Sequence, residues 1–335
     1  MKVSGLAFSY KKGISVLDDI TFEIGNGEIA TLLGRSGSGK TTVLNMIAGF
    51  LEPLRGRIEM DGKDVRSLPP GKRDIGMVMQ DLSLFPNMTA SQNVEYGLRA
   101  RGVTKAEAKE RSLAVMEGMD IADKWDRNVL DLSGGERQRI ALARSIVYRP
   151  RLLLMDEPLS SLDPALREGL RREVKELLKA EGITTLYVTH DRTEALSVSD
   201  RIFIMDSGRI VESGDPHGIY RRPRTLKGAS FMGVLTPIPV LSLHGTLHMT
   251  PFGPVSIDGG PSDHLGYHPE YARWSDPGDA IRIKGKVSLC EFRGSYHLIE
   301  VSTRSGIFAA SSSGPIPIGA RAEFFIRRED LFPLK

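Results

Sequence analysis

Apolar runs of β-type residues alternate with longer helical patterns over about the first 230 residues of the chain. Alternating strands and helices are typical of an α/β domain, so this region predicts one. The runs predict buried strands at residues 29–33, 75–79, 152–155, 185–188 and 201–205.

Helical patterns replace the strand signals between residues 87 and 143, with clear stretches at 104–119 and 136–147. We therefore expect a helical subdomain at about 87–143 within the α/β core. A further helix is predicted at 164–180, because Asp163-Pro164 offers a capping aspartate followed by proline at the first helical position.

The composition changes near Gly233, after which glycine, proline and serine are frequent and long helical periods disappear. These features predict two domains, at 1–233 and 234–335, with the second rich in β structure. Its strands are expected at 241–248, 280–287, 297–301 and 321–326.

Composition narrows the class of protein. A length of 335 residues is sufficient for two domains. The net charge is only +3 and the basic clusters are short and dispersed, so these clusters are expected to lie on solvent-exposed surfaces rather than to bind nucleic acid. The single Cys290 excludes an intrachain disulfide. The first residues lack the apolar segment of a signal peptide, and no apolar run approaches the ~20 residues of a membrane span. A membrane role would therefore need a second chain.

Four of the five histidines in the C-terminal region form two pairs spaced by four residues: His244 with His248, and His264 with His268. This spacing brings two rings to one face only in a helix, and the sequence predicts strands and loops in this region. We therefore expect no metal site there.

The sequence GRSGSGKT at 34–41 lies between the first apolar run and a helical pattern, the context of a phosphate-binding loop. Its glycines and the helix start present N–H groups to phosphate. Lys40 is expected to reach the β- and γ-phosphates, and the Thr41 hydroxyl to join a Mg²⁺ shell. The nucleotide-binding residues expected here are Gly34, Ser36, Gly37, Ser38, Gly39, Lys40, Thr41 and Thr42.

Two carboxylates, Asp156 and Glu157, end the apolar run at 152–155. Side chains at the end of a parallel strand project into the ligand crevice. Asp156 is expected to hold Mg²⁺ and Glu157 to orient the attacking water, because phosphoryl transfer depends on positioning and charge stabilisation.

A second anion-binding helix start is predicted at Ser133. Ser133 and Glu136 have the spacing of a capping box, and Gly134 and Gly135 leave the backbone bare. A plain helix cap without a ligand remains the alternative at this point.

Together these motifs resemble the nucleotide-binding subunits of ATP-binding cassette (ABC) transporters. Residues 132–138, LSGGERQ, are similar to the signature sequence of that family, and the resemblance covers roughly residues 1–235. By this resemblance Gln80 is the glutamine that senses Mg²⁺ and the permease, and Asp163 communicates across a dimer. His190 bridges water and the γ-phosphate, and Tyr10 stacks on adenine.

The resemblance implies that two copies pair head to tail and enclose two ATP molecules. Ser133 and Gly135 of one copy would contact the γ-phosphate that Lys40 of the other holds. The implied catalytic residues are Glu157, His190 and Gln80, and the implied Mg²⁺ ligands are Thr41, Gln80 and Asp156.

The C-terminal region resembles one class within this family, the importer ATPases. LGYHPE at 265–270 is similar to a segment of the small TOBE-like, OB-type β-barrel in importer ATPases for maltose, sulfate, iron and polyamines, although His268 replaces the usual arginine. The implied fold class is an α/β P-loop domain of ABC type with a helical subdomain, followed by a small β-rich domain.

The resemblance implies an importer ATPase that powers uptake by ATP-driven dimer closure. It would work at the cytoplasmic face of the inner (plasma) membrane, under two permease subunits supplied by a solute-binding protein, with no nucleic acid. Residues 82–86 are the expected permease contact. The alternative is a non-transport ABC ATPase of the DNA-repair or clamp type, but the insert before Ser133 is too short for a coiled-coil arm. Nothing in the sequence selects the solute.

Overall fold

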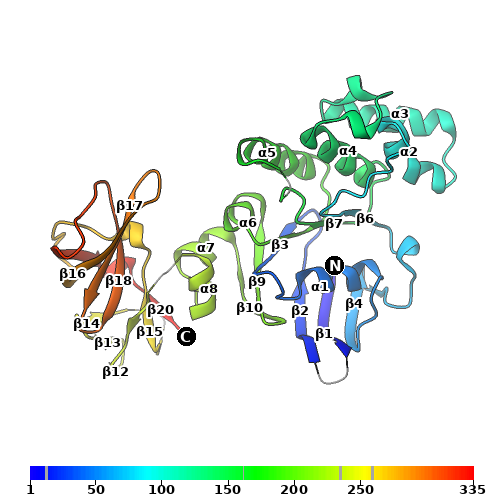
Figure 1. The fold of residues 1–335 in the computed structure, drawn as a ribbon. Helices are drawn as coiled ribbons and strands as arrows, with labels where there is room; N and C mark the ends of the chain where they lie inside the picture. The colour runs from blue at the N-terminus through cyan, green and yellow to red at the C-terminus, as the bar shows by residue number, and fades with distance from the viewer. Residues whose placement is uncertain (12–13, 161, 234–235, 258–259) are drawn as a thin grey trace. The chain divides into compact units, whose positions relative to one another are not determined.

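The computed structural model describes residues 1–11, 14–160, 162–233, 236–257 and 260–335. Ser161 of the expected dimer-communicating segment and Val234 at the expected domain boundary lie outside these residues. The chain divides into two compact units, Met1–Pro216 and His217–Lys335, each described by itself below (Figure 1).

A six-stranded sheet forms the centre of the first unit. Its five parallel strands confirm the five apolar runs, and the edge strand β10 is antiparallel to β9. In spatial order the strands are β10 (Arg209–Gly214), β9 (Arg201–Asp206), β3 (Ile29–Gly34), β8 (Thr185–Thr189), β7 (Leu152–Asp156) and β6 (Ile75–Val78).

Both faces of this sheet are covered, which explains why its parallel strands are mostly apolar. Along β7, Leu152 and Leu154 enter the core on one face, and Leu153 and Met155 enter the core on the other. All five residues of β7 are buried.

An antiparallel sheet covers one face together with the helix α1 (Lys40–Ala48). The sequence patterns missed this sheet, because repeated register shifts between β1 and β2 break the alternation of apolar and polar positions. Its order is β2 (Ile14–Glu23), β1 (Lys2–Lys11), β4 (Arg55–Met60) and β5 (Lys63–Asp64).

Helices cover the other face. The predicted helices are confirmed, and α2, α3 and α4 gather in one cluster in the region expected to be helical (Figure 1). The Asp163 side chain caps α5 by accepting from Leu166 N at 3.0 Å, with Pro164 as the first helical residue, as predicted. The bounds are α2 (Ala90–Ala100), α3 (Lys105–Gly118), α4 (Gly134–Ile146), α5 (Pro164–Ala180) and α6 (Arg192–Val198), with short 3₁₀ turns at Pro70–Lys72, Ala122–Lys124 and Val129–Asp131.

A buried arginine ties down the C-terminal end of α1. The Arg73 guanidinium donates to Met46 O and Ile47 O of that helix, both at 2.8 Å, and to Leu68 O and Arg66 O, both at 2.9 Å. Arg73 is 5% exposed, and burial lowers its pKa. The last carbonyls of a helix lack partners within it, so Arg73 supplies a charged donor to Ile47 O and a second donor to Met46 O, which also accepts from Gly49 N at 3.2 Å.

In its described residues, the second unit contains two short helices and three small antiparallel sheets. The expected strand at 241–248 is wrong as a single element: it is a hairpin of β12 and β13 that turns at Gly245, whose φ is 65°. The sequence patterns also missed β18 (Gly306–Ser312). The helices are α7 (Pro216–Arg221), which straddles the two units, and α8 (Leu226–Phe231).

The other strands expected in this unit are confirmed, with longer bounds for β16 and β17. The three sheets have the strand orders β11-β15-β20, β12-β13-β14 and β18-β17-β16-β19. Their bounds are β11 (Ile238–Pro239), β12 (Ser242–His244), β13 (Leu247–Thr250), β14 (Gly253–Ser256), β15 (His264–Gly266), β16 (Ala280–Phe292), β17 (His297–Thr303), β19 (Arg321–Arg327) and β20 (Phe332–Leu334), with 3₁₀ turns at Pro269–Tyr271 and Arg328–Asp330.

The division between the two compact units, after Pro216, precedes the composition change near Gly233 in the sequence. The expected boundary at Gly233 falls inside the second unit, because α8 belongs to that unit. Leu226 N donates to Lys335 O at 3.0 Å, and Ala229 packs with Phe332 and Leu334 of β20.

His268 is buried in the second unit rather than offered to a ligand. Its ring stacks on Tyr220, with centroids 4.5 Å apart, and Nε2 lies 2.5 Å from Tyr220 O.

In the described part of the chain, no group of three or more histidine, cysteine or acidic side chains could hold a metal ion. No helix in that part is both long and apolar enough to cross a bilayer.

The arginine anchor predicts a stability change. Replacing Arg73→Met should lower the free energy of unfolding by about 3 kcal/mol, because two buried and two partly buried carbonyls lose a charged donor. Arg66→Met is the matched control, since its side chain makes only an exposed pair with Asp64 and should cost less than about 1 kcal/mol. Urea denaturation measures both, and equal losses would contradict the anchoring role.

Candidate functional site

The glycine-rich sequence forms a tight loop between β3 and α1, as its context predicted. Gly37 and Gly39 have φ values of 80° and 101°, in the left-handed region that favours glycine. A Cβ at Gly34 would lie 2.6 Å from both Met205 O and Ser38 Oγ, so this position admits only glycine. The loop is therefore a concave backbone cradle that opens at the start of α1.

Lys40 lies over this loop. Its Nζ donates to Gly34 O at 2.9 Å and to Arg35 O at 3.2 Å, and the side chain is buried. Burial lowers the pKa of Lys40, while Glu157 and Asp156 raise it. The loop thus combines backbone N–H groups with a desolvated ammonium, which suits a phosphate chain.

Two oxygen ligands adjoin this loop. The Thr41 hydroxyl donates to Asp156 Oδ1 at 3.4 Å. Burial raises the pKa of Asp156, and the Thr41 hydrogen bond opposes that rise. Hydroxyl and carboxylate oxygens are ligands that Mg²⁺ prefers. The buried Ser38 Oγ has no hydrogen-bond partner among the described residues, so this cradle retains an unused polar group for a ligand.

Glu157 and His190 meet beside these ligands. Glu157 Oε1 lies 3.1 Å from His190 Nδ1, which joins the end of β7 to the end of β8. The backbone of Glu157 is left-handed, with φ at 45°, and its N–H donates to Val188 O at 2.9 Å. A strained backbone at a non-glycine residue is more frequent at functional sites than elsewhere.

A buried network involves Thr189 and Asp191, the residues on either side of His190 in the chain, and the sequence analysis missed it. The carboxylate of Glu194 accepts from Thr189 Oγ1 at 2.7 Å and from the Tyr187 hydroxyl at 3.2 Å. Thr189 Oγ1 in turn accepts from Asp191 N at 3.0 Å. Burial raises the pKa of Glu194. An acidic residue in the first turn of α6 was the available signal, but it resembles an ordinary helix cap.

Gln80 follows β6 at the same end of the sheet and is exposed. The segment after it turns through left-handed residues at Leu82 and Ser83. Arg144 of α4 donates to Leu82 O at 2.7 Å and to Ser83 O at 2.6 Å, so it ties this segment to the helix that begins at Ser133. The sequence analysis did not identify Arg144.

Tyr10, near the end of β1, lies beside the first turn of α1. Its hydroxyl is 3.3 Å from Thr42 Oγ1, and its ring contacts Phe8 edge to face. The residue is 63% exposed, so its ring is accessible for stacking next to the phosphate loop.

The predicted capping box is confirmed at the start of α4. Ser133 Oγ accepts from Glu136 N at 3.3 Å, and Glu136 Oε2 accepts from Ser133 N at 2.7 Å. Among the described residues, no hydrogen bond or ion pair links Ser133 with Lys40, Asp156 or Glu157. The structure therefore brings together the loop, Asp156, Glu157 and His190, but not the start of α4.

Comparison with known proteins agrees with this geometry. The family model described as ABC transporter matches residues 17–160. The spermidine/putrescine import ATP-binding protein PotA of Frankia alni is 37% identical over 96% of this chain and 76% of its own length. The chain belongs to the ATP-binding subunits of ABC transporters. As such an ABC subunit, it binds ATP and is an ATPase.

Other relatives of this ABC subunit agree. The Fe(3+) ions import ATP-binding protein FbpC of Escherichia coli is 41% identical over 79% of this chain and 77% of its own. The structure of cbiO1 from Clostridium perfringens, part of an ABC transporter complex, has a TM-score of 0.61 at 31% identity, over 65% of this chain and 89% of that one. A dimeric bacterial ABC transporter cassette has a TM-score of 0.58 at 29% identity, over 64% and 98%. The predicted fold class is therefore confirmed.

Proposed function

We propose that this ABC subunit powers solute import by hydrolysing Mg²⁺-ATP at a site completed by a second copy of itself. The observation that carries the proposal is the separation of two anion-binding features. The phosphate loop, Asp156, Glu157 and His190 gather at one end of the sheet, whereas the capped start of α4 lacks such partners in its own chain.

Thr41, Asp156 and Gln80 would hold Mg²⁺. The support is the pair of oxygen ligands 3.4 Å apart beside the phosphate loop. When bound, the ion would supply charge neutralisation for the phosphates. Gly34, Ser36, Gly37, Ser38, Gly39, Lys40 and Thr42 would hold the phosphate chain, and Tyr10 would stack on the adenine.

Glu157 would orient the water that attacks the γ-phosphorus. A bond forms from that water to phosphorus as the bond to the β-phosphate oxygen breaks, and ADP and phosphate leave. His190 holds the Glu157 carboxylate by a contact of 3.1 Å and would reach the γ-phosphate itself. The Glu194 network would position His190 through Thr189.

The partner copy would supply Ser133 and Gly135 to the γ-phosphate, with Asp163 acting across the interface. The capped start of a helix suits an anion, and a similar cassette has been solved as a dimer. The membrane-facing partner would be a permease at the cytoplasmic face of the membrane, supplied by a solute-binding protein.

We assign no cargo. Relatives of similar identity are named for spermidine/putrescine and for Fe(3+), so the nucleotide site does not select the solute. Both names describe import, which argues against the alternative of an ATPase acting on DNA.

The role of Glu157 predicts a separation of binding from turnover. Glu157→Gln should bind ATP as the wild type does but lower kcat by about 10²–10⁴-fold, the range for loss of a catalytic acid or base. Glu110→Gln, an exposed position on α3, is the control. Phosphate release and nucleotide binding are measured on the same preparations, and near-normal hydrolysis would remove Glu157 from this role.

The shared site predicts complementation between copies. Ser133→Asp should keep the helix cap, because aspartate caps as well as serine, but should repel the partner's triphosphate and abolish hydrolysis. Lys40→Ala should be inactive as well. Mixing the two variants should restore about a quarter of wild-type activity, since half of the dimers are mixed and each has one intact site. Activity that stays at zero in the mixture, with both variants folded, would contradict a shared site.

The expected permease contact at residues 82–86 predicts that transport can be lost while ATP hydrolysis is retained. The Asn93 side chain accepts a hydrogen bond from Phe85 N and donates one to Phe85 O. The Arg144 guanidinium lies 5.5 Å from the centre of the Phe85 ring. Phe85→Glu should leave the ATPase rate of the free subunit within about twofold but abolish transport by the reconstituted complex, because it places a charge in an apolar contact. Leu54→Glu, at an exposed leucine of the first unit, is the control. Normal transport by the Phe85 variant would reject this contact.

A further inference from the structure

The carboxylate of Glu157 is carried by a strained backbone that is held on both sides. Its φ of 45° is left-handed, a conformation that persists at a side-chain-bearing residue only where the surrounding structure enforces it. On the N-terminal side, Glu157 N donates to Val188 O at 2.9 Å. On the C-terminal side, Glu157 O accepts from Ser160 N at 3.1 Å and from Ser160 Oγ at 2.8 Å. The orientation of Glu157 therefore depends on the position of Ser160.

Arg167 of α5 holds the residues that follow Glu157. Its Nη2 donates to Leu162 O at 2.7 Å and to Ser160 O at 3.3 Å. Both hydrogen bonds come from this one nitrogen, and Nε is buried without a hydrogen-bond partner among the described residues. A hydrogen bond from a charged donor is stronger than one from a neutral donor. The guanidinium therefore fixes Ser160 and Leu162 to the first turn of α5.

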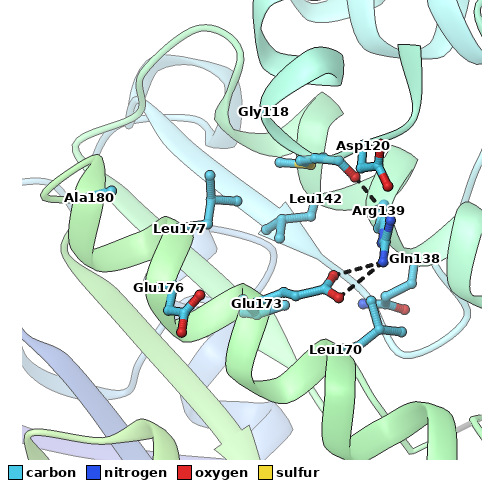
Figure 2. Close-up of a pocket in the computed structure, with 12 residues that line it drawn as sticks. Gly118, Asp120, Gln138, Arg139, Leu142, Leu170, Glu173, Glu176, Leu177 and Ala180 are labelled. Atoms are coloured by element: carbon cyan, nitrogen blue, oxygen red, sulfur yellow. Dashed lines mark hydrogen bonds and ion pairs between the residues drawn. The ribbon is translucent and has the colours of Figure 1, made fainter. Parts of the chain in front are cut away.

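The helix α5 gives Arg167 a defined position. Its residues Leu170, Val174 and Leu178 are buried. Figure 2 shows the ion pair that joins Glu173 of α5 to Arg139 of α4, with nitrogen and oxygen 2.9 Å apart. Close packing and a bridge to the neighbouring helix restrict the movement of α5, so it can support a side chain that positions others.

The charge of Arg167 also reaches the network beside His190. Burial raises the pKa of Glu194, whereas the hydrogen bond from Thr189 and the positive charge of Arg167 lower it. A positive charge lowers the pKa of a carboxyl group when the two are close. The same guanidinium therefore lies near the residues that flank both Glu157 and His190.

We propose that Arg167 is a positioning residue: through Ser160 it holds Glu157 of its own chain in the orientation that the attacking water requires. This inference rests on the role proposed for Glu157 but not on the shared site, because every contact that carries it lies within one chain. Without Arg167 the carboxylate remains in the site but loses its alignment, and a displacement of about 1 Å is enough to lower a rate about 100-fold.

Replacing Arg167→Met, which keeps a long side chain and removes its donors, tests this role. The change should lower kcat about 10–100-fold while the Kd for Mg²⁺-ATP stays within about twofold, because the phosphate loop is unaltered. Arg167→Lys should return kcat to within about threefold of the wild type, because one ammonium can donate to both carbonyls. Arg172→Met, at an exposed position of α5, is the matched control and should change neither constant. Phosphate release and nucleotide binding are measured on the same full-length preparations.

Two further variants separate positioning from a general effect on folding. In Glu157→Gln, which lacks the carboxylate, adding Arg167→Met should lower the residual rate by less than about twofold, because residues that act as a unit are not additive. Ser160→Ala removes one of the two donors to Glu157 O and should lower kcat about threefold at an unchanged Kd. This variant tests the same contacts even if Arg167→Met does not fold.

Four results would each overturn the proposal. They are a near-normal kcat of Arg167→Met, a Kd that rises in step with the fall in kcat, no recovery in Arg167→Lys, and a full further loss in the Glu157→Gln background. Near-normal hydrolysis by Glu157→Gln alone would refute the role of that carboxylate and this inference with it. Failed complementation between Ser133→Asp and Lys40→Ala would refute only the shared site.

Discussion

The parallel register of β3, β8 and β7 is the constraint on which the candidate site depends. Leu33 pairs with Thr189, and Asp156 pairs with Val188, so the three strands end at one level. The chain leaves these strands directly into the phosphate loop, His190 and Glu157. A one-residue shift of any strand would turn its side chains to the opposite face and separate the groups. Coverage of the sheet on both faces holds that register, since each strand has apolar side chains in two cores.

The sequence predicted the parts of the fold in which one physical rule acts alone. The five parallel strands are mostly apolar because both faces of their sheet are covered, and α5 begins at its aspartate cap and proline. The β1–β2 sheet escaped prediction because register shifts disrupt its alternation, and β12 and β13 were merged because Gly245 gives little sign of a turn within a β-type run. Patterns of apolar and polar positions record neither a register shift between paired strands nor a turn made by a single glycine.

The same division applies to the candidate site. Residues adjacent to the strand ends, such as Lys40 and Glu157, carry local signals in glycine spacing and paired carboxylates. Residues that contact the site from distant parts of the sequence carry no such local signal. Arg73 reaches the carbonyls at the end of α1 from a later loop, and Arg144 reaches the segment after Gln80 from α4. Each is one arginine among many in the sequence, and only the tertiary structure identifies its partners.

Position 157 shows conformation and chemistry in competition. The left-handed backbone there would suit glycine, which adopts it without steric cost, whereas a side chain raises the energy of the folded state by about 1–3 kcal/mol. Glycine would relieve that strain and remove the carboxylate that meets His190. A chain selected for thermodynamic stability alone would favour glycine at this point, so the glutamate exchanges some stability for the carboxylate that contacts His190.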